Sequence, residues 1–230
     1  MSQPSIVTSF LSRNWWKITG VLFVFYSIVM GFLGEVPRLP ILHETIRNLY
    51  FHVTMWFAMV IILTVSVTHG IKFLSKGQRY NDIVSAEAAH VGILLGVLGT
   101  ITGSLWANNT WGAWWVNDPK LNGAAISLLF YFAYFILRSS IPDNEKKARV
   151  SAIYNIFAYT MMLVFIGVLP RMTDSLHPGN GGNPGFGGYD LDGTMKLIFY
   201  PAIIGWSLLA VWILSIRVGF KVLTEKIENN

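Results

Sequence analysis

The sequence predicts an all-α integral membrane protein, a bundle of six transmembrane helices with both termini in the cytoplasm. Three features predict this fold: few charged residues, six long uncharged runs, and an uneven distribution of Lys and Arg among the connections. Of the 230 residues, 13% are charged and 53% are hydrophobic, whereas soluble domains carry about 25% charged residues. Such a chain cannot cover a globule with polar surface, and its composition also excludes intrinsic disorder.

Each uncharged run has about the length of one membrane span. A helix needs about 20 apolar residues, within a range of about 17 to 25, to cross the hydrocarbon core. Five runs contain 17 to 20 residues, and the first contains 16 but has Trp15 and Trp16 beside it as interfacial anchors. We therefore expect a single polytopic domain over residues 1–230, with helices at about 15–34, 50–72, 86–107, 121–138, 149–170 and 196–217. The runs themselves are 18–33, 50–69, 88–107, 121–137, 150–169 and 197–216.

Other interpretations of the runs are weaker. The first run could belong to a cleaved signal peptide, but the segment that follows it lacks a small-x-small cleavage site. A β-barrel is disfavoured because the runs show no alternation with a period of two. The third run has glycines on one helix face, which predicts a close helix–helix contact. These glycines are Gly92, Gly96, Gly99 and Gly103.

The orientation follows from the basic residues. Twelve Lys and Arg lie on the side of the termini and of the second and fourth connections, and five lie on the other side. Cytoplasmic connections carry the excess of positive charge, so both termini are expected inside. The net charge of +5 is thereby explained by topology, and we expect no nucleic-acid binding. The chain has no Cys, which excludes disulfides, thiolate ligands and covalent thioether attachment of heme.

The second outer connection, at residues 108–120, is unusually rich in tryptophan. Together with Trp106, it places four tryptophans within ten residues. An interfacial aromatic belt accounts for one or two such rings, whereas a shaped apolar platform for a flat aromatic ligand accounts for all four. The composition does not decide between the two. The other three rings are those of Trp111, Trp114 and Trp115.

Two of the five histidines are candidate metal ligands. His52, at the outer end of the second helix, and His177, in the third outer connection, are expected on the same side as the tryptophans. Two neutral imidazoles beside a flat apolar surface match the two axial positions of a porphyrin iron. His43 lies on the same side and competes with His52, whereas His69 and His90 are expected near the inner helix ends.

The segment at residues 111–121, WGAWWVNDPKL, resembles the WWD signature of the heme-handling proteins of cytochrome c biogenesis. A six-helix chain of this length, with the signature between helices three and four, is similar to the heme exporter protein C family. That family has two outer histidines that ligate heme, in a Tyr-x-His segment and in a Leu-His pair. His52 follows Tyr50 with one residue between them, and His177 follows a leucine. Two departures are Asn117, where the family commonly has Trp, and Val53, where a Pro often stands.

The resemblance implies a protein that binds heme b non-covalently and transiently on the periplasmic face of the bacterial inner membrane. It implies contacts from Trp106, Trp111, Trp114, Trp115 and Asp118, and axial ligation by the two histidines. It also implies transfer to a periplasmic heme chaperone, with an ABC-type ATPase and a second membrane subunit as further partners. The chain has no Walker motif, so ATP hydrolysis belongs to another chain, and an assembly factor is expected rather than an enzyme.

Two alternatives remain open at this point. The chain could be a membrane transporter, but a proton- or sodium-coupled carrier needs ionisable groups inside the membrane and the six runs contain no Asp, Glu, Lys or Arg. It could also be a heme-containing subunit of a membrane oxidoreductase, with heme inside the bilayer. That function favours mid-helix histidines, whereas His52, His69 and His90 lie near helix ends.

Overall fold

The computed structural model describes residues 6–39, 42–177 and 191–228, and the side chains within them from residue 13 onward. The described part of the chain holds six helices that are long and apolar enough to cross a membrane, and no strand beyond one isolated bridge between Leu39 and His43. The predicted all-α, six-helix fold class is confirmed. The elements are α1 (Ile6–Leu33), the 3-10 helix η1 (Glu44–Asn48), α2 (Leu49–Lys76), α3 (Arg79–Trp111), α4 (Pro119–Ser140), α5 (Asn144–Met162) with its π and 3-10 continuations η2 (Leu163–Val168) and η3 (Leu169–Arg171), and α6 (Gly193–Glu228).

Helix α3 begins well before its uncharged run, and the charges at that end are paired. Asp82, near the start of α3, has only 3% of its side chain exposed and accepts two hydrogen bonds of 2.8 Å from Arg138 of α4. Arg79 of α3 also contacts Asp82 and donates a 2.7 Å bond to Glu225 of α6. A buried carboxylate is tolerated when it is paired and hydrogen-bonded. These bonds tie α3, α4 and α6 together at one end of the bundle.

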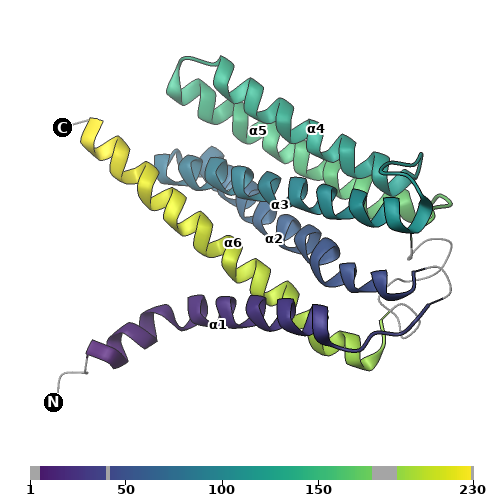
Figure 1. Cartoon of the computed structure of the whole chain (residues 1–230). Helices are drawn as coiled ribbons and strands as arrows, with labels where there is room; N and C mark the ends of the chain where they lie inside the picture. Colours follow the sequence, from purple (N-terminus) through teal and green to yellow (C-terminus); the bar gives the residue numbers. More distant parts are fainter. Residues whose placement is uncertain (1–5, 40–41, 178–190, 229–230) are drawn as a thin grey trace.

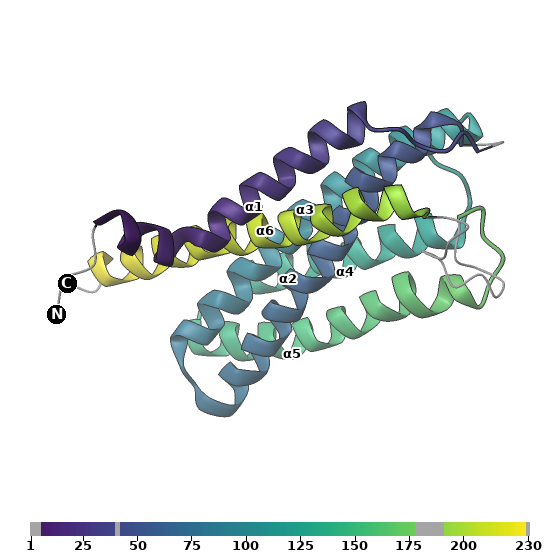
Figure 2. The ribbon, with the colours of Figure 1, turned by 90° about the horizontal axis from the view of Figure 1, so that it is seen from below.

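The bundle is layered around the antiparallel pair α2–α3 (Figures 1 and 2). Helix α6 contacts α2 and α3 on one side and α1 on the other, while the α4–α5 hairpin packs against α2 and α3 from the opposite direction. Both termini lie at one end of the bundle, and the described residues of the connections that follow α1, α3 and α5 lie at the other end (Figure 1). The three connections predicted to face outward are therefore gathered at one end.

The glycine face of α3 is its contact surface with α2. A Cβ atom at Gly103 would lie 2.5 Å from Cε1 of His52, and one at Gly99 would lie 3.0 Å from Nε1 of Trp56. Real Cβ atoms do not approach other heavy atoms this closely, so only glycine admits these neighbours. The close packing expected from the sequence therefore extends to the outer end of α2, where it fixes the position of His52.

The cytoplasmic location of the termini stays a prediction, which reporter fusions can check. Fusions placed after Gly77 and Pro142, in the short connections at the end that holds the termini, should report the cytoplasm. A fusion after Asn117, at the opposite end, should report the periplasm. The reason is the excess of Lys and Arg on the side of the termini. A cytoplasmic signal from the Asn117 fusion contradicts the orientation.

Candidate functional site

His52 is held rigidly on the first turn of α2. Its Nδ1 lies 2.8 Å from the carbonyl oxygen of Gly99 on α3. A carbonyl oxygen only accepts hydrogen bonds, so Nδ1 carries the proton and Nε2 keeps its lone pair. The imidazole also makes edge-to-face contacts with Trp56 and Trp106, at centroid distances of 6.3 and 6.0 Å. This environment presents an imidazole in the tautomer that can bind a metal through Nε2.

Trp106 connects the outer end of α3 to the first outer connection. Its Nε1 donates a 3.0 Å hydrogen bond to Oγ1 of Thr45 in η1. Asn48, at the end of the same short helix, donates a 2.8 Å bond to the carbonyl oxygen of Thr102. These two bonds hold η1, which leads into α2, against the outer end of α3. The ring of Trp106 is thereby fixed beside His52.

The tryptophan-rich connection is shorter than the sequence suggests, because α3 continues to Trp111. Gly112 then ends the helix with φ of 76°, a left-handed conformation that glycine adopts without strain, and its N–H bonds to the carbonyl oxygen of Asn108. Asp118 caps α4 and Pro119 occupies the first turn. The connection is therefore residues 112–118, fixed at both ends by helix termini.

Two tryptophans of this connection project outward. Trp114 is 60% exposed and Trp115 is 43% exposed. The indole Nε1 of Trp115 donates to Oδ1 of Asn122, 3.4 Å away, and Asn122 donates a 2.7 Å bond to Oδ1 of Asn117. The amide of Asn117 thus shapes the connection. The family that the sequence resembles commonly has Trp at this position. The exposed rings are available to a ligand or to lipid.

His177 is held by a buried carboxylate. Its Nδ1 lies 3.0 Å from Oδ1 of Asp118, which is 1% exposed. The other oxygen of Asp118 accepts 2.8 Å bonds from Oγ of Ser175 and from the backbone N–H of Leu176. Since a carboxylate accepts, Nδ1 of His177 carries the proton and Nε2 again keeps its lone pair. The carboxylate therefore fixes both the position and the tautomer of this histidine.

The electrostatics keep this pair in the form that binds metal. Burial raises the pKa of Asp118, but the hydrogen bonds from Leu176 and Ser175 outweigh that effect and hold the pKa below its ordinary value. Burial lowers the pKa of His177, although Asp118 opposes the shift. At neutral pH the carboxylate is therefore charged and the imidazole is neutral, and neutral imidazole is the metal-binding form.

The two histidines converge on the outer end of α3. The ring of Trp111, the last residue of α3, makes an edge-to-face contact with His177 at a centroid distance of 4.9 Å. Trp106, on the same helix, contacts His52. The structure thus places His52 against Trp106 and His177 against Trp111, both at the outer end of α3, and the assignment of these residues to a heme site stays a prediction.

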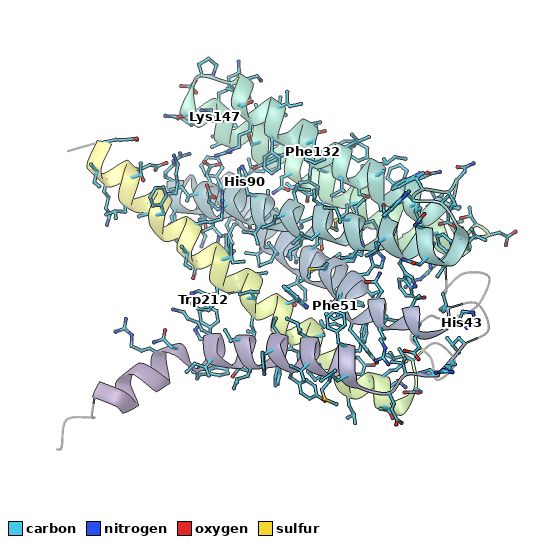
Figure 3. All side chains as sticks on the ribbon, in the orientation of Figure 1. His43, Phe51, His90, Phe132, Lys147 and Trp212 are labelled. Carbon is cyan, nitrogen blue, oxygen red and sulfur yellow. The ribbon has the colours of Figure 1, made fainter. Side chains whose placement is uncertain are left out.

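The other three histidines lie in different surroundings. His43 is exposed in the first outer connection, with φ of 44°. His69 contacts Oδ1 of Asn81 at 2.9 Å, and His90 bonds to the carbonyl oxygen of Ala86 at 2.9 Å. Figure 3 shows His43 at the end of the bundle that holds the tryptophan-rich connection, whereas His90 lies toward the opposite end. His43 alone shares the end of the bundle that holds His52 and His177.

The whole chain matches one known family. The model of "CcmC: Heme exporter protein C" matches residues 2–230. The chain belongs to the heme exporter protein C family. Its membership, together with the six long apolar helices, identifies it as a multi-pass protein of the bacterial inner membrane.

Individual relatives are more distant. Heme exporter protein C of Rhodobacter capsulatus is 25% identical over 139 residues, which are 60% of this chain and 57% of the relative. The protein of the same name from Paracoccus denitrificans is 24% identical over 153 residues, 66% of this chain and 63% of its own length. Cytochrome c biogenesis protein CcsA of Prochlorococcus marinus subsp. pastoris is 40% identical over 87 residues, 38% of this chain and 27% of the relative. The chain thus spans less than two thirds of each of these relatives.

Some groups of the candidate site cannot be identified from the sequence alone. The carbonyl oxygen of Gly99 and the hydroxyl of Ser175 fix the two histidines, yet neither has a local signal, because each acts across the fold. Asp118 before Pro119 predicts a turn or a helix cap, but its bonds to residues 175–177 depend on tertiary structure. Thr45, the partner of Trp106, is likewise visible only in three dimensions.

Proposed function

We propose that this protein binds heme on the outer, periplasmic face of the membrane and transfers it to a periplasmic heme chaperone during cytochrome c maturation. An ABC-type ATPase and a second membrane subunit work with it. In this proposal the heme is of the b type and is held transiently, since it must be passed on. It is held non-covalently, because the chain has no Cys for thioether bonds. Any other reaction of the heme is carried out by the partner proteins. The chain itself acts as an assembly factor.

The observation that carries this proposal is the shared state of two histidines. Both use Nδ1 to donate a hydrogen bond, His52 to a carbonyl oxygen and His177 to a carboxylate. Both therefore keep the Nε2 lone pair, and their Nδ1 partners are the outer-sphere groups typical of metal-binding histidines. His90 makes the same kind of bond, to the carbonyl oxygen of Ala86, but toward the other end of the bundle (Figure 3). His52 and His177 combine this bond with ring contacts to Trp106 and Trp111 at the outer end of α3.

The surrounding residues fit a porphyrin. Iron accepts imidazole nitrogen in its axial positions, and its macrocycle needs apolar, flat neighbours. In this proposal His52 and His177 ligate the iron. Trp106 and Trp111 hold the two imidazoles, and Trp114 and Trp115, largely exposed, cover the macrocycle. Bound heme supplies the iron; the chain supplies two nitrogen ligands and an apolar surface.

The two proposed ligands differ in a way that suits transfer. His52 belongs to a helix and packs against Gly103, so it is fixed by the core of the bundle. His177 belongs to the connection between α5 and α6 and is held there by hydrogen bonds to Asp118. Breaking a few hydrogen bonds frees His177, whereas moving His52 requires repacking α2 on α3. Release of heme thus begins at His177.

The proposal is tested by following heme. The full-length protein, purified from membranes in detergent, should carry heme, and the soluble domain of its heme chaperone should take up that heme on mixing. Absorption spectra of the two proteins after separation measure the transfer. A purified protein that neither contains heme nor binds added heme contradicts the proposal.

A second prediction concerns the glycine beside His52. Gly103→Ala places a methyl group 2.5 Å from Cε1 of the imidazole, so the ring must leave its position against α3. Heme affinity should fall by roughly tenfold or more, because a displaced ligand loses its outer-sphere bond. Heme titration of the purified variant measures the change. Gly219→Ala on α6, where nothing lies within 4 Å of the new methyl group, is the control and should bind as the unchanged protein does.

A further inference from the structure

Asp118 lies in the tryptophan-rich signature, yet its carboxylate has no capacity for a ligand. Oδ1 accepts bonds from the backbone N–H groups of Lys120, at 2.9 Å, and Leu121, at 3.4 Å, and from Nδ1 of His177. Oδ2 accepts bonds from Ser175 and Leu176. A carboxylate offers about four lone-pair directions, and these five donors occupy them. With 1% of its side chain exposed, Asp118 cannot also contact heme.

We infer that Asp118 is a positioning residue for His177, and that it acts on heme through this histidine alone. This inference rests on the proposed function. The carboxylate fixes the Nδ1–H tautomer, joins residues 175–177 to the first turn of α4, and thereby couples His177 to the tryptophan-rich connection that Asp118 ends. A carboxylate partner also raises the basicity of an imidazole ligand.

The two imidazoles consequently differ as ligands. His52 donates to a neutral carbonyl oxygen, whereas His177 donates to a charged carboxylate. The electron-rich imidazole of His177 stabilises ferric iron more than the imidazole of His52 does, because negative charge beside the ligand favours the higher oxidation state. Asp118 therefore sets both the occupancy and the reduction potential of the site. A residue that only caps a helix has no such effect on a bound iron.

The substitution Asp118→Asn separates the capping of α4 from the proposed positioning of His177. Asparagine caps helices as well as aspartate does, so α4 keeps its start. The amide, however, carries no charge. Its NH2 group replaces one carboxylate oxygen and cannot accept the hydrogen bonds that this oxygen accepted. Asp143→Asn is the matched control, because Asp143 also caps a helix, α5, by accepting a 2.7 Å bond from the backbone N–H of Lys146, and it lies in the short connection between α4 and α5 at the end of the bundle that holds the termini (Figure 1).

The experiment uses the full-length protein in detergent, with heme as the probe, and measures affinity and reduction potential. Asp118→Asn should lower heme affinity by roughly 10- to 100-fold, the usual cost of losing an outer-sphere partner, and should shift the potential upward. Asp143→Asn should leave both unchanged. If the Asp118→Asn variant has the same heme affinity and the same reduction potential as the unchanged protein, the inference is wrong.

A double-mutant cycle guards against a purely structural effect. In a His177→Ala background, Asp118→Asn should cause no further loss of affinity, since the residue through which it acts is gone. An equal loss in both backgrounds overturns the inference while leaving the proposed function standing. An unchanged protein that binds no heme overturns the proposed function itself, so the two failures are distinguishable.

Discussion

Replacing either His52 or His177 by alanine should convert a six-coordinate, low-spin heme into a five-coordinate form. Each substitution removes one of the two proposed nitrogen ligands, and the Nδ1 partner of each histidine shows that the ring is held in the ligand-competent tautomer. Heme content after purification should fall sharply, and most in the double variant. Added imidazole should partly restore the low-spin spectrum of each single variant, because it supplies the missing nitrogen.

The controls for this experiment are the remaining histidines. His43→Ala, His69→Ala and His90→Ala should leave the spectrum nearly unchanged. His43 is the most informative of these, because it lies at the same end of the bundle (Figure 3). A large change with His43→Ala and none with His52→Ala would show that the ligand was assigned to the wrong residue.

The double substitution of Trp114 and Trp115 by alanine should lower heme affinity while leaving the protein inserted in the membrane. A well-placed aromatic contact contributes about 0.5 to 1.5 kcal/mol beyond the area that it buries, so losing two rings should weaken binding by roughly 10- to 100-fold. Neither ring is part of the core, since the two residues are 60% and 43% exposed. Heme titration of the purified variant gives the affinity.

The matched control is a tryptophan of equal exposure at the other end of the bundle. Trp15 on α1 is 62% exposed, and its sequence position suits an interfacial anchor. Trp15→Ala should leave heme affinity unchanged. Equal affinities for the double variant and the unchanged protein would identify Trp114 and Trp115 as membrane-belt residues without a role in binding.

The fold could be predicted from the sequence because membrane spans obey a simple rule. Uncharged runs of about 20 residues located all six helices. The rule finds apolar centres, however, and not helix ends. It missed that α3 begins at Arg79, because the charges there are neutralised by long-range pairs with Arg138 and Glu225. It also missed that α3 continues to Trp111, since the ending depends on the conformation of Gly112.

The sequence proposes members for the candidate site but not their contacts. Residue type and expected topology selected His52, His177 and the tryptophans, and their role in a heme site stays a prediction. The groups that orient the histidines were not predictable, because a backbone carbonyl such as that of Gly99 carries no sequence signal. The role of Asp118 was likewise hidden, since its local pattern predicts a helix cap and its bond to His177 arises only from the fold.

The central claim is that His52 and His177 bind the same iron, and electron paramagnetic resonance of the ferric, heme-loaded protein tests it most directly. The purified full-length protein should give a low-spin signal characteristic of two imidazole ligands. That signal should be replaced by a high-spin signal in both His52→Ala and His177→Ala. A high-spin signal from the unchanged protein, or a bis-imidazole signal that survives either substitution, contradicts the claim.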